Sequence, residues 1–410
     1  MRNKTVWALL LALMIMTAAV AGMAELPTAT EGIVIPVIEN MSTYTVPDNE
    51  AMALMRDMKC GWNLGNTFDA YRGEGYAGRG EMAIESSWVG VLTSEAMIEA
   101  IHDAGFHTIR IPVSWHNHVT DVDFTISQPW LDRVKTVVDW AIARDMYVIL
   151  NTHHDEGYDT FYPLNAYYDQ SEKYITSIWR QLAETFRDYD EHLIFEAMNE
   201  PRLKGHANEW WFDANSKDCL EAADCINRLN QAFVNTVRAA GGGNADRYLM
   251  VPGYDASPDG ALRDQFTLPQ DTADNRIIVS VHAYTPYNFA LQDGGVSSFT
   301  PSNQQTTEIA TFMNSLYKKY TAQGIPVVIG EFGARAKGNN LQDRVNYAAY
   351  YIAFASARNI PALWWDNGSF SGNGENFGLL NRRQAAWAYP EIVQALMQYG
   401  GYEKFPEKNN

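Results

Sequence analysis

The chain has 410 residues, of which 46% are apolar, 12% aromatic and 20% charged. This composition supports a large hydrophobic core and excludes an intrinsically disordered or collagen-like chain. The formal net charge of −18 repels nucleic acids and anionic lipid surfaces, so we expect neither as a partner. A neutral substrate is compatible with such an acidic surface.

Residues 1–24 have the pattern of a secretory signal peptide. Arg2 and Lys4 precede an apolar run from Val6 to Val20, and Gly22-Met23-Ala24 provides the small residues of a cleavage site. The apolar run is short for a membrane span and no second run follows, which favours cleavage over a membrane anchor. We expect a secreted or periplasmic protein without membrane contact after cleavage. Its net charge falls from −18 (31 basic against 49 acidic residues) to −20 (29 against 49).

The remaining chain predicts one large domain between two short flanking segments. Residues 25–50 are rich in Pro, Thr and Glu without a periodic pattern and predict an extended lead-in. Over residues 51–400, eight short β-rich runs alternate with eight amphipathic stretches, and residues 401–410 form a tail. This alternation predicts a single (β/α)₈ TIM barrel. The alternative, a doubly wound open sheet, needs a Gly-rich phosphate turn after the first strand, and Gly61 to Asn66 lacks that spacing.

The predicted elements can be given in chain order. Strands are expected over Cys60–Gly65, His107–Trp115, Tyr147–His153, Leu193–Glu200, Tyr248–Tyr254, Ile277–Tyr284, Pro326–Glu331 and Pro361–Trp365. The clearest helical stretches are Trp130–Ala143, Ser171–Arg187, Cys219–Ala240, Thr307–Tyr320 and Leu341–Arg358.

Three cysteines, Cys60, Cys219 and Cys225, are too few for a disulfide scaffold in a chain of this length. The spacing of Cys219 and Cys225 fits neither a zinc knuckle nor a redox CxxC motif. We interpret all three as structural, and a bridge between Cys219 and Cys225 stays open at this point.

Two glutamates end predicted strands at the rim where a barrel enzyme carries its active site. Glu200 lies in Asn199-Glu200-Pro201 at the end of the fourth strand, and Glu331 lies in Gly330-Glu331-Phe332-Gly333 at the end of the seventh. Because side chains alternate along a strand, Glu200 shares a face with Ile194, Glu196 and Met198, and Glu331 shares one with Ile325, Val327 and Ile329. We therefore expect both glutamates to point inward at the same rim.

Two carboxyl groups that face each other across a pocket are the machinery of glycoside hydrolysis. The alternative, two surface glutamates in loops, is disfavoured because apolar runs lead directly into both. Glu196 lies deeper in its strand, where we expect it to pair with a cation such as Arg110. An arginine beside a carboxylate keeps that group ionised, as a nucleophile requires, whereas burial keeps a carboxyl protonated near neutrality so that it can donate.

An ordered set of motifs, nearly one for each strand, resembles glycoside hydrolase family 5, and within it the endo-β-glucanases of subfamily 4. The resemblance covers about residues 51 to 395 and implies a retaining hydrolase of β-1,4-linked glucans with carboxyl groups about 5–5.5 Å apart. The motifs are Gly61-Trp62-Asn63-Leu64-Gly65-Asn66-Thr67, Ile109-Arg110-Ile111-Pro112-Val113-Ser114-Trp115, Asn151-Thr152-His153-His154, Phe195-Glu196-Ala197-Met198-Asn199-Glu200-Pro201, His282-Ala283-Tyr284-Thr285-Pro286, Ile329-Gly330-Glu331-Phe332-Gly333 and Trp365-Asp366-Asn367-Gly368.

The resemblance also implies roles for individual residues. Glu200 matches the family's acid/base and Glu331 its nucleophile. The matching substrate-binding or orienting residues are Asn199 for the sugar 2-hydroxyl, Arg110 and Tyr284 beside the nucleophile, His153, His154 and His282 at the cleavage subsite, Trp365 as an aromatic floor, and Asn66 and Trp115. Trp364 stands where an aliphatic residue or tyrosine is expected, which leaves open whether Trp364 or Trp365 stacks on the sugar. Cys60 stands where a small residue is expected.

Aromatic residues near the strand ends indicate a long, open cleft for internal cleavage of a polymer. Six tryptophans lie there, and we expect about half of them to be core residues: Trp88, Trp115, Trp210, Trp211, Trp364 and Trp365. The expected remote sugar platforms are Trp210, Trp211, Tyr158, Phe161, Tyr162, Tyr167 and Tyr168.

Other kinds of protein stay open as alternatives. A metal-dependent hydrolase could use His153, His154 and His282, although adjacent histidines on a strand face opposite ways. A non-catalytic glycan-binding barrel and an endo-β-mannanase of the same family are further alternatives. We expect no metal and no cofactor, a β-glucan polysaccharide as the binding partner, and a monomer.

Overall fold

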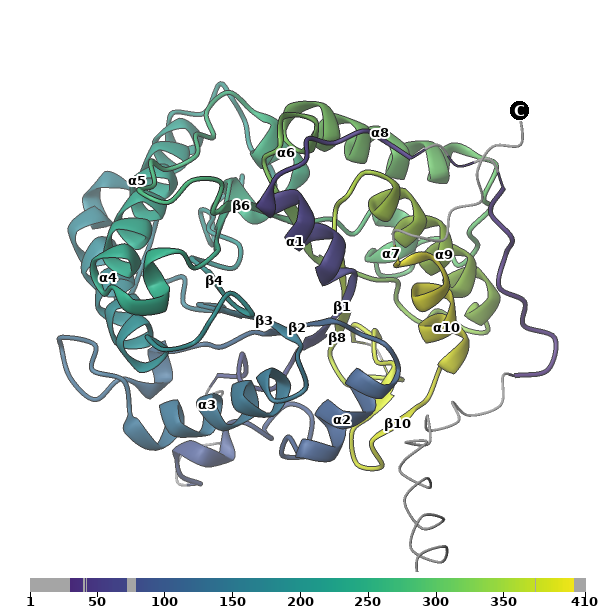
Figure 1. Cartoon of the computed structure of the whole chain (residues 1–410), viewed down its shortest axis with the longest axis horizontal. Helices are drawn as coiled ribbons and strands as arrows, with labels where there is room; N and C mark the ends of the chain where they lie inside the picture. The colour runs from purple at the N-terminus through teal and green to yellow at the C-terminus, as the bar shows by residue number, and fades with distance from the viewer. Residues whose placement is uncertain (1–29, 40, 42, 72–78, 373, 402–410) are drawn as a thin grey trace, which may run out of the picture.

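The computed structural model describes residues 30–39, 41, 43–71, 79–372 and 374–401. The predicted signal peptide, the tail beyond residue 401 and part of the lead-in lie outside these residues. Eight parallel strands close into a barrel in the order β1 to β8, and helices surround it (Figure 1). The predicted (β/α)₈ barrel is confirmed.

Each of the eight predicted strands is present, and most are shorter than the sequence pattern suggested. The second runs only to Ile111, because Pro112 has no N–H to donate to the sheet. The observed strands are β1 (Cys60–Leu64), β2 (Thr108–Ile111), β3 (Tyr147–Asn151), β4 (Leu193–Glu196), β5 (Leu249–Pro252), β6 (Ile277–His282), β7 (Val327–Phe332) and β8 (Ala362–Asp366). Two short strands, β9 (Leu380–Asn381) and β10 (Ala386–Trp387), pair antiparallel after the barrel.

The helices present apolar stripes to the outside of the barrel, and their polar faces are turned to solvent. In the described part of the chain they are α1 (Glu50–Met58), α2 (Glu95–Asp103), α3 (Gln128–Ile142), α4 (Tyr168–Thr185), α5 (Lys217–Ala239), α6 (Pro258–Leu262), α7 (Tyr287–Ala290), α8 (Gln304–Lys319), α9 (Leu341–Ala357) and α10 (Pro390–Tyr399). No helix in the described residues is long and apolar enough to cross a bilayer.

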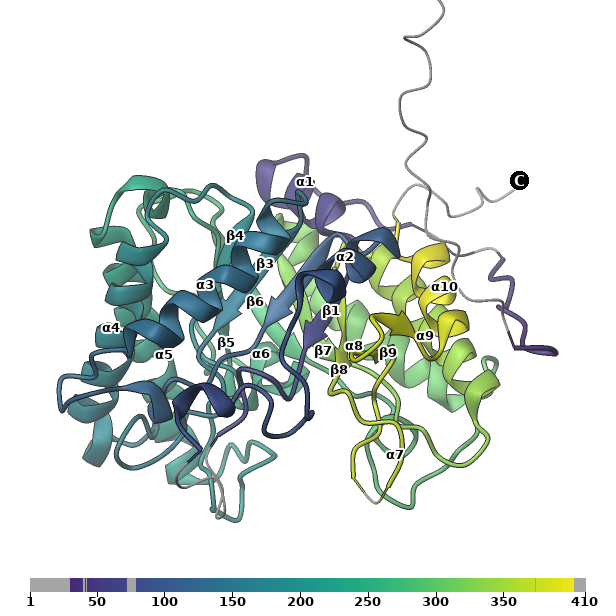
Figure 2. The same ribbon diagram turned by 90° about the horizontal axis from the view of Figure 1, so that it is seen from below.

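Helix α1 closes the end of the barrel at which the strands begin (Figure 2). Its residues Ala51, Met52, Leu54, Met55 and Met58 form one buried cluster with inward-facing strand residues, which are Tyr147, Ile149, Ile194, Tyr248, Met250, Ile278, Val328 and Leu363. Two residues further along several strands the inward side chains become polar: Asn63, Arg110, Asn151, Glu196 and Ser280. The apolar layer therefore seals one end and supports a polar floor toward the other.

The described residues before α1 run over the surface, mostly without helix or strand. The Tyr399 hydroxyl on α10 donates to the Pro36 carbonyl and accepts from the Ile38 N–H, and the Tyr44 N–H donates to the Ala357 carbonyl at the end of α9. The segment is thus held by backbone and side-chain hydrogen bonds to the last two long helices.

The cysteine question left open by the sequence is settled by helix geometry. Cys219 and Cys225 both lie on α5, six positions apart, so their Cα atoms are separated by about 9 Å along the axis, beyond the reach of a disulfide. All three cysteines are free and buried, and burial raises the pKa of the Cys225 thiol to about 11.

Candidate active site

Glu331 points into the barrel because β7 contains a bulge. Ser280 and Val281 pair with Val328 and Ile329, but the next residue, His282, pairs with Glu331, so Gly330 is skipped. Val328 faces inward, whereas Val327 and Ile329 belong to the outer core. The prediction that Glu331 shares a face with Val327 and Ile329 is therefore wrong, since the extra residue returns the glutamate to the interior.

The glycine at this bulge is closely packed against His282. A Cβ at position 330 would lie 3.1 Å from His282 Nε2, tighter than ordinary van der Waals contact. The Asn63 amide on β1 donates to the Gly330 carbonyl at 2.8 Å and thereby holds the bulge. Asn63 belongs to the first sequence motif, but its role depends on a strand far away in the chain.

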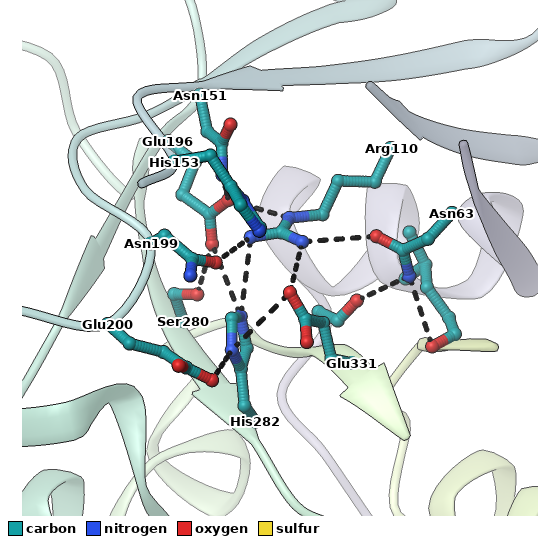
Figure 3. A network of polar contacts seen from close by, with 12 residues as sticks. Asn63, Arg110, Asn151, His153, Glu196, Asn199, Glu200, Ser280, His282 and Glu331 are labelled. Atoms are coloured by element: carbon teal, nitrogen blue, oxygen red, sulfur yellow. Dashed lines mark hydrogen bonds and ion pairs between the residues drawn. The ribbon is translucent and has the colours of Figure 1, made fainter. Parts of the chain in front are cut away.

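The carboxylate of Glu331 is held on both sides. Arg110 Nη1 donates to Oε1 at 2.7 Å, and the Tyr284 hydroxyl donates to Oε2 at 2.9 Å (Figure 3 shows the arginine contact). Arg110 and Glu331 are buried. Because Arg110 and Tyr284 each hold one oxygen of this buried carboxylate, its orientation is fixed.

Arg110 is the centre of the polar floor. Its Nε donates to Glu196 Oε2 at 2.7 Å, which confirms the predicted ion pair inside the barrel. Glu196 also accepts from Asn151 Nδ2 at 3.1 Å and from the Ser280 hydroxyl at 2.5 Å. Burial raises the pKa of Glu196, but Arg110, His282 and Ser280 together outweigh that effect and lower the pKa to about 2. Arg110 therefore makes an ion pair with each of two buried carboxylates, Glu196 and Glu331.

Glu200 lies beyond the end of β4, opposite Glu331. His282 Nδ1 contacts Glu200 Oε1 at 2.9 Å and Glu331 Oε1 at 3.7 Å, so the histidine lies between the two carboxylates (Figure 3). One oxygen of Glu200 and one of Glu331 lie within 4.8 Å of each other. The structure therefore brings the two predicted glutamates together at one rim of the barrel. Met198 belongs to the outer core, so strand alternation does not explain the position of Glu200.

The electrostatics around Glu200 differ from the sequence expectation. Burial raises its pKa, but the hydrogen bond and positive charge of His282, followed by the charge of Arg202, lower it below the ordinary value. Burial lowers the pKa of His282, whereas Glu331, Glu196 and Glu200 raise it, to about 10 overall. The expectation that burial keeps Glu200 protonated is therefore wrong, because His282 and Arg202 together outweigh burial. The 2.9 Å contact between Glu200 and His282 is short enough for a proton to pass between them.

Asn199 is held by the same arginine. Its Oδ1 accepts from Arg110 Nη2 at 2.8 Å. Because the amide oxygen is occupied by this bond, the NH₂ group of Asn199 is the end available to a ligand. The Asn199 side chain therefore lies beside Glu200, and its NH₂ group can donate a hydrogen bond to a ligand.

The two adjacent histidines after β3 lie in the same region. The rings of His153 and His154 are 4.4 Å apart, and both are neutral because burial lowers the pKa of each, that of His154 to about 4. The expectation that they face opposite ways is wrong, since β3 ends at Asn151 and strand alternation no longer applies. His153 stacks parallel to Trp365, with ring centroids 5.7 Å apart.

The structure decides between the two tryptophans of β8. Trp364 packs in the outer core and its Nε1 donates to the Phe377 carbonyl, whereas Trp365 shares the inward face with Leu363. Gly65 leaves room for the indole ring, because a Cβ at position 65 would lie 2.8 Å from the Trp365 ring. Trp365 is therefore the tryptophan that lines the site.

Two of the predicted substrate-binding residues, Trp115 and Asn66, are engaged in contacts within the protein. Trp115 is fully buried and its Nε1 donates to the Asn151 carbonyl, so the expectation that it belongs among the substrate-binding residues is wrong. Its aromatic ring fills the core beneath the rim. Asn66 is half-buried in the turn after β1, with a positive φ of 57°, and its N–H donates to Asp69 Oδ2 at 2.9 Å.

Exposed aromatic side chains flank the site on several loops. Trp88, Tyr158, Trp210 and Trp211 are 41%, 58%, 55% and 60% exposed, and Trp88 lies against Tyr71 and His154. Among the other predicted platforms, Tyr167 and Tyr168 are half-buried, while Phe161 and Tyr162 are buried and do not offer a face to a sugar.

Two clusters of the described residues could geometrically hold a cation: Glu200, His282 and Glu331, and Asp69, His153 and His154. In the first, the donors already bind each other and lie beside the Arg110 guanidinium, which repels a cation. In the second, both Asp69 oxygens accept backbone N–H groups, from Asn66 and Thr67. The ligand atoms are therefore engaged within the protein, which does not favour a metal centre.

Comparison with known proteins agrees with this geometry. Residues 71–371 match the family model of cellulase (glycosyl hydrolase family 5). The chain belongs to glycosyl hydrolase family 5. It is 42% identical to endoglucanase B of Ruminococcus albus over 367 residues, covering 89% of this chain and 84% of that protein.

Two solved structures of the family are closely similar. One is a family 5 lichenase from Caldicellulosiruptor sp. F32 in complex with cellotetraose, with 53% identity, a TM-score of 0.88, and coverage of 90% of this chain and 100% of that one. The other is a GH5-4 broad specificity endoglucanase from Ruminococcus champanellensis with bound cellotriose, with 43% identity, a TM-score of 0.79, and coverage of 86% and 100%. This family 5 protein is a glycoside hydrolase with endoglucanase activity.

Proposed function

We propose that this endoglucanase is secreted, acts as a monomer, and cleaves internal β-1,4-glucosidic bonds of soluble β-glucans with retention of configuration. The observation that carries the mechanism is the pair of carboxyl groups of Glu200 and Glu331, whose nearest oxygens lie within 4.8 Å. Retaining glycosidases have carboxyl groups about 5–5.5 Å apart, whereas inverting enzymes need about 6.5–9.5 Å to admit a water molecule.

In the first step Glu331 is the nucleophile. One of its oxygens forms a bond to the anomeric carbon, and the bond from that carbon to the leaving sugar oxygen breaks. Arg110 and Tyr284 each hold one oxygen of the attacking carboxylate, at 2.7 and 2.9 Å. The Asn199 NH₂ group donates to the sugar 2-hydroxyl, a contact that strengthens as the transition state forms.

The leaving oxygen takes its proton from Glu200. Glu200 and His282 hold the transferable proton between them, across 2.9 Å. In the second step Glu200 takes a proton from water, the water oxygen forms a bond to the anomeric carbon, and the bond to Glu331 breaks. The sugar leaves with its original configuration and the enzyme returns to its starting state.

The substrate class is supported by the surface around the site and by the relatives. Trp88, Tyr158, Trp210 and Trp211 are exposed on three different loops and offer flat apolar faces to several sugar rings. The 53% identical relative is a lichenase, which supports mixed-linkage β-glucan as a substrate beside cellulose derivatives and xyloglucan. The net charge of −18 suits an uncharged polymer, and the leader-like residues 1–24 support secretion.

The test combines the stereochemistry of the product with two variants. NMR of the first product should show the β-anomer, and Glu200→Gln and Glu331→Gln should each lower turnover by several orders of magnitude, about 10³-fold or more, with unchanged circular dichroism. The α-anomer as first product, or near-normal turnover of either variant, would overturn the mechanism. A preference for mannan over β-glucan in the same assay would move the enzyme to a mannanase.

A further inference from the structure

Arg202 lies two residues after Glu200 and has no part in the roles described so far. Its side chain is 7% exposed. Its Nη1 donates to the Glu200 carbonyl at 2.8 Å and lies 3.9 Å from Glu200 Oε2. The guanidinium therefore contacts both the backbone and the carboxyl group of the same glutamate.

The side chain of Arg202 is also held from the loop after β3 and from its own loop after β4. Nη1 donates to Glu156 Oε1 at 3.2 Å, and Nε donates to Glu209 Oε1 at 3.3 Å. Glu209 is itself held, because its Oε2 accepts from the Gly205 N–H at 2.9 Å. The arginine therefore cannot move away from Glu200 without breaking several polar contacts.

An exposed aromatic ring covers the flat face of this arginine. The guanidinium carbon lies 4.1 Å from the centre of the Trp210 ring, the distance of a cation–π contact. Trp210 is 55% exposed, so its other face is open to a sugar ring. Trp211 is similarly exposed, at 60%, but among the described residues the cation–π contact of Arg202 is made with Trp210 and not with Trp211.

We propose that Arg202 is a positioning residue for Glu200, and that Trp210 excludes water from the guanidinium and so strengthens its action on the acid/base. The inference rests on the proposed function, in which Glu200 protonates the leaving sugar. Charges interact more strongly when water is excluded, so a sugar ring on the open face of Trp210 adds to the same effect.

Other charged and titratable groups also face Glu200 and must be considered in a pH profile. They are His282 on β6, His154 after β3, Glu156 in the loop that follows, Asp255 after β5, Tyr284 after β6, Glu331 on β7 and Glu375 after β8. Of the groups in that list, His282 has both a charge that lowers the pKa of Glu200 and a contact with its carboxyl group. Arg202 shares both properties. Loss of Arg202 should therefore raise the pKa at which the Glu200–His282 pair gives up its proton.

Two substrates with different leaving groups can distinguish a specific effect on the acid Glu200 from a general loss of activity. A dinitrophenyl β-cellobioside needs no protonation of its leaving group, whereas a β-glucan does. Arg202→Met should lower kcat/KM on soluble β-glucan about tenfold and on the dinitrophenyl substrate less than about twofold. The alkaline limb of the kcat/KM profile should move to higher pH. Arg202→Lys keeps the positive charge but lacks the planar guanidinium group. It should lose less activity, and the alkaline limb of its kcat/KM profile should stay at the native pH.

Matched tryptophan variants test the contribution of the covering ring. Trp210→Ala should move the alkaline limb in the same direction as Arg202→Met, and Trp211→Ala should leave the limb at the native pH. If Arg202→Met does not fold, Arg202→Met with Glu156→Gln removes the unpaired buried carboxylate and carries the same test. If Arg202→Met lowers kcat/KM equally on both substrates and leaves the alkaline limb of the pH profile at the native pH, the inference is overturned. A Glu200→Gln variant without leaving-group dependence would instead overturn the proposed function.

Discussion

The buried ion pair between Glu196 and Arg110 should make a large, pH-dependent contribution to stability. Glu196 is fully buried, which raises its pKa, but the charge of Arg110, assisted by His282 and Ser280, lowers the pKa to about 2, against the ordinary 4.5. At about 1.4 kcal/mol per pH unit, this difference corresponds to about 3 kcal/mol of unfolding free energy. Glu196→Gln keeps the shape of the side chain and removes the charge, so it should cost about that amount at pH 7.

The sign of the pH dependence follows from the direction of the pKa change. Because the folded-state pKa lies below the unfolded value, the stabilisation is fully present above about pH 4.5 and is lost as the pH falls toward 2. Urea unfolding of the native and Glu196→Gln proteins at pH 7, 5, 4 and 3 should therefore show a difference that shrinks with falling pH. The control is Glu50→Gln: Glu50 makes an Arg276 contact of the same 2.7 Å but is 80% exposed, so its loss should cost less than about 1 kcal/mol.

Two results would refute this reasoning. A loss that is the same at pH 7 and pH 3 would mean that Glu196 acts through its shape and hydrogen bonds alone. A loss at pH 7 no larger than that of Glu50→Gln would mean that the desolvation of the buried pair cancels its attraction.

Three further predictions concern the bulge, metal ions and the mode of cleavage. Gly330→Ala should lower kcat by about tenfold or more, because its Cβ would press on His282, and near-native turnover would show that the bulge tolerates a side chain. Dialysis against a strong chelator should leave activity unchanged, since Glu200 and Glu331 complete the reaction, and a lasting loss restored by zinc or calcium would reveal a required ion. The viscosity of a soluble β-glucan should fall faster than reducing ends appear, whereas early release of only glucose or cellobiose would identify an exo-acting enzyme.

The fold and the chemistry of the site could be predicted from local features of the sequence. Period-two apolar runs alternating with period-3.6 stripes specify the eight strands and helices, because each element buries one face or stripe against its neighbour. The pairing of Glu196 with Arg110 also followed from the sequence, since a charge deep in a barrel strand needs a partner of opposite sign. The prediction that Glu200 and Glu331 meet at one rim also followed from their positions at strand ends.

The orientation of individual side chains at that rim depended on the tertiary structure. Glu331 turns inward only because Gly330 is skipped in the pairing with β6, and the Asn63 amide from β1 holds that bulge. Likewise, the pKa of His282 is raised because carboxylates from several strands converge on it. Strand and helix patterns are properties of a few consecutive residues, so they can be read from the sequence. The sequence by itself therefore determined the barrel and the motifs at its rim. The position of the bulge and the pKa values at the site are set by neighbours tens to hundreds of residues away, which only closure of the barrel brings into contact.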